Sequence, residues 1–281
     1  MKVLKTQNQS LTPPQVQPLP VNANNELIDI RSVHLNTQLM VDHPANRDAY
    51  LSLKETTPAR LGMGRAGLRY KTRSVLRLRA DHAAAQDSVW ADVPSKFIQS
   101  MNMLPLQSQC QDETEYLTRP DHGRQLSIAA AAKVTQLIDK GPSVLLAVGD
   151  GLSSEAITAN VGDVIPAIKQ GLKLHDIAIN TIPFIRFSRV AVEDQLGELT
   201  HAKVVCLLIG ERPGLVTPKS MSAYIAYQPT VGMAEARRTV ISNIHPGGIP
   251  AVEAGAYIAE TIWNMLTLKK SGLDLKEALK N

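Results

Sequence analysis

The chain of 281 residues contains few aromatic residues and few cysteines. Phe, Trp and Tyr make up 4% of it, so the stacking platforms that bind single-stranded nucleic acid are scarce. Its two cysteines, Cys110 and Cys206, are too few for a disulfide framework, and Cys206 lies inside an apolar, strand-like run. This cysteine usage is typical of a reducing compartment.

Long apolar segments are also missing. No run approaches the roughly 20 apolar residues that cross a bilayer. The first residues, MKVLKTQNQSLTPPQVQPLP, lack the apolar segment of a secretory signal. We therefore expect a cytoplasmic protein that does not engage a membrane.

The motifs of several kinds of catalytic site are absent. The seven histidines show neither H-E-x-x-H nor another paired spacing of metal ligands, and no C-x-x-C occurs. There is no G-x-S-x-G and no Walker loop. The pattern D-x-H-x-x-G, in which a histidine ligates cobalt from below a corrin, is missing too. The sequence thus predicts no catalytic and no metal-ligating residue in this chain.

The residues that are present predict three regions in a chain that is 44% apolar and 20% charged. Residues 1–25, rich in Pro, Gln and Asn, are typical of a flexible tail. Residues 26–120 are predicted to be smaller and mainly helical, with the clearest helix at residues 74–93. Residues 121–281 are predicted to form an α/β domain.

Strand-like and helical segments alternate in residues 121–281. Buried strands are predicted at 143–150 and 203–210, and further strands at 177–190, 223–229 and 239–244. Helices are predicted at 126–141, 151–174 with a break near Pro166, 193–202, and 250–272 with Gly272 at its end. Such alternation predicts a doubly wound, mostly parallel sheet.

Three predicted strand ends carry polar, glycine-bearing sequences: VGDGLSSE (148–155), IGERPGL (209–215) and ISNIHPGG (241–248). In open α/β sheets, ligands bind beyond the carboxyl ends of the strands. Each segment also has a structural explanation, such as Ser153 or Ser154 capping the following helix. Together they favour a ligand cleft, with Asp150 and Asn243 as secondary candidates.

The stretch LGMGRAGLRY spells G-x-G-x-x-G at Gly62, Gly64 and Gly67. A dinucleotide-binding loop needs a buried strand directly before it, and LSLKETTPARL is not one. Asp87, 20 residues after Gly67, falls on a predicted helix rather than after a second strand. A turn that allows close packing is therefore favoured, and an NAD-binding oxidoreductase remains the alternative.

A block of basic residues without any acidic one runs from Arg60 to Arg79. Its members are Arg60, Arg65, Arg69, Lys71, Arg73, Arg77 and Arg79. Such a block could meet phosphates, an acidic protein surface or only water. A basic nucleic-acid-binding module is thus a second alternative.

Seven strings, in order, resemble the small subunits of ethanolamine ammonia-lyases, and the resemblance covers about residues 59–255. They are RLGMGRAGLRYKT, LRADHAAAQDSVW, YLTRPDHGRQL, DGLSSEAI, RVAVEDQLGE, VVCLLIGERPGL and RTVISNIHPGGIPAVEAG. The resemblance implies a hetero-oligomeric, adenosylcobalamin-dependent radical enzyme that converts ethanolamine to acetaldehyde and ammonia. It further implies a TIM-barrel large subunit that holds the substrate, and a Rossmann-like domain here that covers the cobalamin.

The cobalamin contacts of that family fall on three residues of this sequence. Val190 would line the cleft near the nucleotide tail, and Glu211 would accept hydrogen bonds from amides or ribose. The third is Val240, where other members can have Cys. Members packaged in bacterial microcompartments tend to begin with an amphipathic helix, which the prolines here oppose; packaging stays possible.

The same resemblance gives the basic block a role. Its arginines would dock on the large subunit, with Arg65, Arg69 and Arg73 reaching carboxylates across the interface. A solvated basic helix remains the other interpretation.

Overall fold

The computed structural model describes residues 21, 24, 26 and 28–280. The predicted tail, residues 1–25, lies almost entirely outside them. The chain divides into two compact units, residues 1–82 and 83–281. The predicted boundary at residue 120 differs from this division, because a strand within residues 83–120 belongs to the sheet of the second unit.

The first unit is built from short elements. It contains two 3₁₀ turns, η1 (Ile30–Ser32) and η2 (Leu35–Thr37), helix α1 (Arg47–Glu55), strands β1 (Arg65–Ala66) and β2 (Arg69–Tyr70), and the start of helix α2 (Thr72–Trp90). Asn46 begins α1, since its side chain accepts a 3.0 Å hydrogen bond from the Ala49 N–H. The pair β1–β2 is antiparallel.

The second unit contains a six-stranded sheet in the order β3-β5-β4-β6-β7-β8. Its strands are β3 (Met103–Gln107), β4 (Val144–Gly149), β5 (Ile182–Arg186), β6 (Val204–Gly210), β7 (Met221–Tyr227) and β8 (Thr239–Ile244). The first four strands in that order are mutually parallel, whereas β7 is antiparallel to both β6 and β8. The predicted mixed α/β fold with a mostly parallel sheet is confirmed.

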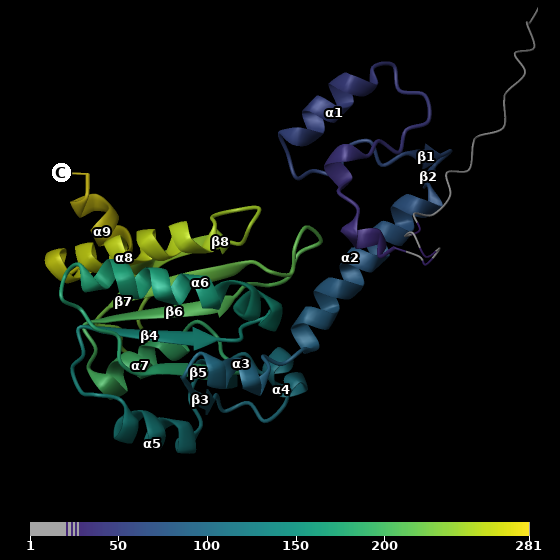
Figure 1. The fold of residues 1–281 in the computed structure, drawn as a ribbon. Helices are drawn as coiled ribbons and strands as arrows, with labels where there is room; N and C mark the ends of the chain where they lie inside the picture. Colours follow the sequence, from purple (N-terminus) through teal and green to yellow (C-terminus); the bar gives the residue numbers. More distant parts are fainter. Residues whose placement is uncertain (1–20, 22–23, 25, 27, 281) are drawn as a thin grey trace, which may run out of the picture. The chain divides into compact units, whose positions relative to one another are not determined.

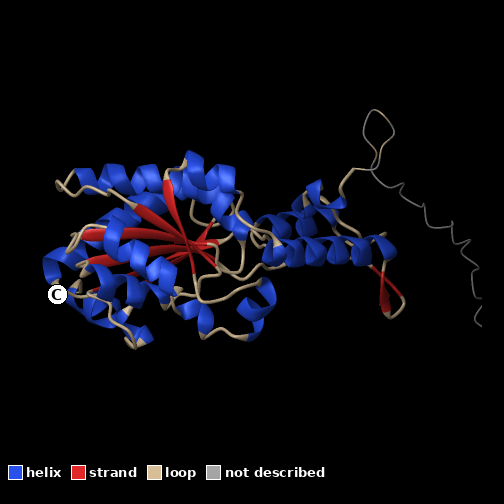
Figure 2. Ribbon diagram, turned by 90° about the horizontal axis from the view of Figure 1, so that it is seen from below, coloured by secondary structure: helices blue, strands red, loops and turns tan. Residues whose placement is uncertain are grey.

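Helices cover both faces of this sheet (Figures 1 and 2). They are α3 (Ser95–Ser100), α4 (Glu113–Thr118), α5 (Ile128–Leu137), α6 (Ser154–Lys173), α7 (Val192–Thr200), α8 (Ala251–Leu268) and α9 (Gly272–Ala278), with 3₁₀ turns η3 (His122–Arg124) and η4 (Glu235–Arg237). Alternate residues of the central strands point to opposite faces. Leu146 and Leu208 therefore pack with α6 and α8, and Leu145 and Leu207 with α5 and α7.

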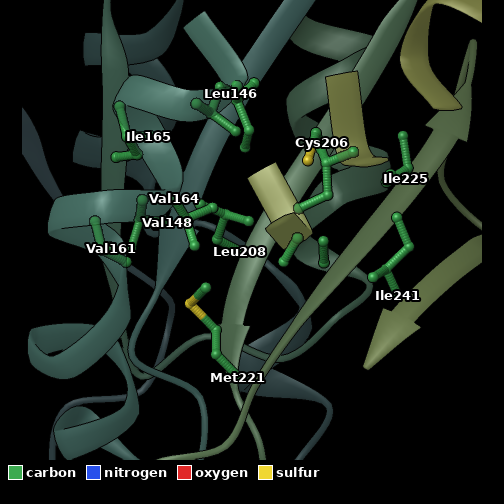
Figure 3. Close-up of a cluster of buried hydrophobic side chains, with 14 of the residues drawn as sticks. Leu146, Val148, Val161, Val164, Ile165, Cys206, Leu208, Met221, Ile225 and Ile241 are labelled. Carbon is green, nitrogen blue, oxygen red and sulfur yellow. The ribbon is translucent and has the colours of Figure 1, made fainter. Parts of the chain in front are cut away.

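The larger core lies between the sheet and the pair α6–α8. Figure 3 shows Val161, Val164 and Ile165 of α6 against Val148 and Leu208 of the sheet. All five side chains are buried, so this face supplies much of the hydrophobic stabilisation of the unit. In the described part of the chain, no helix is both long and apolar enough to cross a membrane.

Two predicted helix boundaries are wrong. Helix α6 continues through Pro166, because buried residues on both sides of it, such as Val164 and Ile168, outweigh the roughly 3 kcal/mol that an internal proline costs. Helix α8 ends at Leu268, where Lys269 takes the left-handed conformation (φ 53°). Gly272 instead begins α9, which the sequence analysis missed.

Strand β3 was also missed, within a region expected to be mainly helical. It contains Pro105, and a proline opposes a central strand. The structure resolves this conflict, because β3 is an edge strand that pairs only with β5 among the strands of the sheet.

Candidate functional site

The three polar segments predicted to share one edge of the sheet do so. The parallel strands β4, β5 and β6 end at the same edge, and β8 runs parallel to β6 because each is antiparallel to β7. A cavity of about 200 Å³ lies there. It is lined by Tyr116, Leu152, Ser188, Arg189, Val190, Ile209, Gly210, Glu211, Arg212, Ser222 and Tyr224, and we call it the strand-end cavity.

Close packing of loops builds the floor of this region. A Cβ added at Gly210 would lie only 2.5 Å from the Asp150 carbonyl oxygen, and one at Gly151 only 2.7 Å from Ile209 Cγ1. Gly151 also has φ +60°, which side chains rarely adopt. Ser153 caps α6 as predicted, with its hydroxyl 3.2 Å from the Ala156 nitrogen. The glycines therefore let the loops after β4 and β6 touch.

Asp150 ties the loop after β5 to the loop after β4. Its carboxylate accepts hydrogen bonds from the Phe187 N–H (2.6 Å) and the Ser188 N–H (2.9 Å). Burial raises the pKa of Asp150 to about 6, although these hydrogen bonds act in the opposite direction. Asp150 does not line the strand-end cavity, so its role in this structure is to hold the loop that leads to Val190.

Glu211 lines the cavity directly after β6. Its oxygen Oε1 accepts hydrogen bonds from the Ser222 hydroxyl (2.6 Å) and the Asn243 N–H (2.9 Å). Burial raises the pKa of the Glu211 carboxyl, but hydrogen bonds of this kind outweigh burial and leave the pKa below its usual value. The Ser220 hydroxyl also lowers this pKa. Neither the Ser222 bond nor the Asn243 bond uses Oε2, so this ionised carboxylate can also accept N–H or O–H groups of a ligand.

The other predicted residues lie around this carboxylate. Val190 lines the cavity from the loop after β5. Val240, on the edge strand β8, is 45% exposed and pairs in register with Tyr224, which lines the cavity. Asn243 has φ +63° and reaches Glu211 through its backbone N–H. The structure thus brings Val190 and Glu211 together and puts Val240 beside the cavity rather than in it.

Two arginines share the cavity with Glu211. Arg189 donates from Nη2 to the Tyr116 carbonyl oxygen (2.9 Å), and its guanidinium lies 4.2 Å above the Tyr116 ring. Its Nε atom is buried without a hydrogen-bond partner. Arg212 is exposed and, within the described residues, forms no ion pair with Glu211 or with any other acid. The charged lining is therefore two guanidinium groups and one carboxylate.

Comparison with known proteins decides the family. The model of the ethanolamine ammonia-lyase light chain (EutC) family matches residues 47–276. This chain belongs to that family. The ethanolamine ammonia-lyase small subunit of Clostridium perfringens is 57% identical over 256 residues, covering 91% of this chain and 87% of the relative. That of Listeria monocytogenes serotype 4a is 57% identical over 248 residues (88% and 85%), and that of Clostridioides difficile 56% over 254 residues (90% and 87%).

The glycine pattern of this light-chain family member lies in the first unit and has no dinucleotide-loop geometry. Gly62, Gly64 and Gly67 all have positive φ, and β1 begins after Gly64 rather than before Gly62. A Cβ on Gly64 would lie 2.9 Å from the Met40 carbonyl carbon. Asp87 is on α2, as predicted. Gly62 and Gly64 serve a tight turn against residues 39 and 40.

Most of the basic block is used inside the first unit. The Asp81 carboxylate forms ion pairs with Arg60 (2.8 Å) and Arg77 (3.0 Å). Arg77 also donates a hydrogen bond to the Val33 carbonyl oxygen (2.6 Å). Other contacts of the block include Lys71 with Asp42, Arg73 with Gln38 (3.1 Å) and Arg65 over Tyr70 (4.5 Å). This usage leaves little of the block for a nucleic acid.

Sequence analysis missed Arg189, Ser222 and Tyr224. Ser222 and Tyr224 alternate on β7, so both point to the same face of the sheet. Because β7 is antiparallel to β6, its amino end, with Ser222 and Tyr224, lies at the edge where β6 ends. The mostly parallel sheet predicted from the sequence did not suggest this arrangement. The pairing of β6 with β7 would have been the signal.

A larger cavity of about 590 Å³ lies beside β3, between α3 and α5. None of the predicted site residues lines it. Its Arg186 is paired with Asp92 (2.8 Å) and Glu113 (3.2 Å), so that charge is already balanced. Among the described residues there is also no group of three or more His, Cys, Asp or Glu side chains that could hold a metal ion.

Proposed function

We propose that this chain is the small subunit of an adenosylcobalamin-dependent ethanolamine ammonia-lyase. Its partner is a TIM-barrel large subunit, which holds ethanolamine, and the complex releases acetaldehyde and ammonia. The observation that carries the proposal is the family match together with a cavity at the strand ends that contains Val190 and Glu211. We further propose that residues 121–281 act as a Rossmann-like cobalamin-binding domain, and that the complex is cytoplasmic.

The residues of the strand-end cavity fit part of a cobalamin. Its volume of about 200 Å³ is below the roughly 300–1,000 Å³ of pockets that enclose drug-sized ligands, so a corrin could not be enclosed by this chain alone. The lining has the chemistry that such a ligand needs. Glu211 offers an acceptor to amide and hydroxyl donors, and Val190 and Tyr224 offer apolar surface. The rest of the ligand would lie across the strand ends towards Val240.

Each residue has a limited task in this proposal. Glu211 binds and orients through Oε2, because Ser222 and Asn243 hold its other oxygen. Val190 excludes water from one wall. When bound, adenosylcobalamin supplies the radical chemistry, and the protein supplies placement and protection from solvent. No residue of this chain is assigned a proton or a bond-breaking step.

Reconstitution tests the proposal. The full chain is mixed with the large subunit, and ammonia release from ethanolamine is measured with and without adenosylcobalamin. We expect release only when both subunits and the cofactor are present. Release by the large subunit alone, or release that ignores the cofactor, contradicts the proposal.

The two alternatives have their own measurements. Enhanced NADH fluorescence on binding that is lost in Gly64→Ala supports the oxidoreductase. Duplex DNA binding that weakens steeply with salt supports the basic module. We expect neither, since Gly64 packs against Met40 and most of the basic block has partners within its unit.

A further inference from the structure

Arg189 and Arg212 are the cationic part of the strand-end cavity, and neither is neutralised there. The only acid that lines the cavity is Glu211, whose hydrogen bonds go to Ser222 and Asn243. Arg189 keeps a buried Nε–H without a partner, which is costly unless an acceptor reaches it. Arg212 presents an exposed guanidinium at the same cavity.

The position of Arg189 is fixed by its surroundings. Its backbone N–H donates to the Gly123 carbonyl oxygen (2.7 Å), and its Nη2 donates to Tyr116 (2.9 Å). The stacking on the Tyr116 ring at 4.2 Å holds the plane of the guanidinium. The guanidinium is therefore held in one orientation rather than averaged over many rotamers.

We propose that Arg189 and Arg212 form an anion subsite that binds a phosphodiester. A planar guanidinium presents forked donors that match phosphate oxygens, and this recognition is stronger than that of a neutral donor. The inference rests on the proposed function, because the phosphodiester of the nucleotide tail is the anionic group among the side arms of a cobalamin. Its neighbouring ribose and amides carry the donors that the Glu211 carboxylate accepts.

The size of the cavity agrees with this assignment. About 200 Å³ is several times the roughly 30 Å³ of one water molecule, which suits a phosphodiester with part of its sugar but not a corrin ring. Val190, next to Arg189 in the chain, would then contact the same tail. The nucleotide tail would thus enter the cavity while the ring stays outside it.

The test compares two ligands and four proteins, each as the complex of the full chain with the large subunit. Binding of cyanocobalamin is measured beside binding of cyanocobinamide, which lacks the phosphodiester and the nucleotide. The proteins are the wild type, Arg212→Met, Arg212→Lys and the control Arg237→Met. Arg237 is exposed and precedes β8, so it lies at the opposite edge of the sheet.

We expect Arg212→Met to weaken cyanocobalamin binding by roughly 10- to 100-fold and to leave cyanocobinamide binding unchanged. Arg212→Lys should recover part of the loss, since it keeps the charge but not the fork. Arg237→Met should change neither. Equal losses for both ligands, or no loss for cyanocobalamin, would overturn the subsite and leave the proposed function standing. A wild type that binds neither ligand would instead overturn both.

Arg189 provides a second variant. Arg189→Lys keeps the charge and removes the buried Nε–H, so we expect the same ligand dependence with a smaller loss. Because Arg189 also contacts Tyr116, its thermal unfolding is recorded alongside. If this variant unfolds, Arg212, whose side chain is exposed, decides the question alone.

Discussion

The first unit and the strand-end edge of the second unit both rely on glycine, but only in the first unit do the glycines form a recognisable sequence motif. Gly62, Gly64 and Gly67 spell a known binding pattern, and the structure uses the first two of them to pack a turn against residues 39 and 40. Gly151 and Gly210 match no motif; Gly210 lines the strand-end cavity, and Gly151 packs directly against Gly210. The strand-end cavity thus follows from topology, which decides where strands end, and not from the spacing of glycines in the sequence.

The same two regions differ in how they use arginine. In the first unit, two arginines, Arg60 and Arg77, share the single carboxylate of Asp81. In the second, one buried arginine, Arg238, meets two buried carboxylates, Glu193 at 3.3 Å and Asp194 at 2.6 Å. Most residues of the dense basic run thus find partners within their own unit, whereas Arg238, outside that run, faces an excess of buried acid.

The largest effect that this comparison predicts is on folding. Gly210→Ala should lower the free energy of unfolding by about 3 kcal/mol or more, because the new Cβ would meet backbone atoms of Asp150 and Ser153, which cannot rotate away. Denaturant unfolding of the purified chain measures it.

Gly162→Ala is the matched control. Gly162 lies within α6, and a Cβ there has nothing within 4 Å. Replacing a helical glycine by alanine should therefore raise stability by about 0.5–1 kcal/mol. If Gly210→Ala were as stable as wild type, the loops after β4 and β6 would not touch as described.

Two variants next test the G-x-G-x-x-G pattern of the first unit. Gly64→Ala should destabilise the first unit by about 2–3 kcal/mol, since it combines φ +69° with a contact to the Met40 backbone. Gly67→Ala should cost only about 1–2 kcal/mol, because its φ is +62° but its surroundings are open. Hydrogen exchange of residues 28–82 measures both. Neither variant should change the affinity for cobalamin. A loss of cobalamin affinity in Gly64→Ala alone would support the glycine pattern as a binding loop.

The sequence sufficed where local pattern and tertiary structure agree. The apolar runs at β4 and β6, Ser153 as the cap of α6 and the shared edge of three strand ends all follow from residue type and period. The sequence was not sufficient where packing between residues far apart in the chain determines the secondary structure. Pro166 is kept helical by a core that no local window contains, and Pro105 is allowed in β3 only because that strand lies at an edge.

The site divides in the same way. Glu211 could be found from a strand end and from resemblance, because it follows the strand predicted at 203–210, whereas Val190 could be found from resemblance alone. Arg189 and Tyr224 could not, since their place in the cavity depends on the side-chain stacking of Tyr116 and on the antiparallel β7. The spacing of residues along the sequence does not indicate contacts of this kind.

A smaller effect is expected at the cavity itself. Glu211→Ala in the complex should weaken cobalamin binding by about 1–3 kcal/mol, because the ligand loses a fixed acceptor and Ser222 loses its partner. Titration calorimetry measures the affinity. Glu260→Ala, at an exposed position of α8, is the control and should bind as wild type does. Unchanged affinity in Glu211→Ala would remove Glu211 from the site.

Counted per pH unit, the smallest effect is a pH dependence that arises from the excess of buried acid around Arg238. Burial raises the pKa of Glu193 from 4.5 to about 8, although Arg238 acts against this. In the unfolded chain Glu193 is ionised above its ordinary pKa, so folding takes up a proton there. Stability should therefore fall as the pH rises from 4.5 to 8, by at most about 1.4 kcal/mol per pH unit from this group.

The window between pH 6 and pH 8 separates Glu193 from Asp150. Asp150 also has a raised pKa, but at about 6, so its contribution is largely lost below this window. Glu193→Gln keeps the shape of a protonated carboxyl and should flatten the slope, whereas Glu260→Gln should keep it. Unfolding free energies at several pH values measure both. A slope that persists unchanged in Glu193→Gln would mean that Glu193 stays ionised beside Arg238 and that another group, such as Asp194, whose pKa burial also raises, takes up the proton.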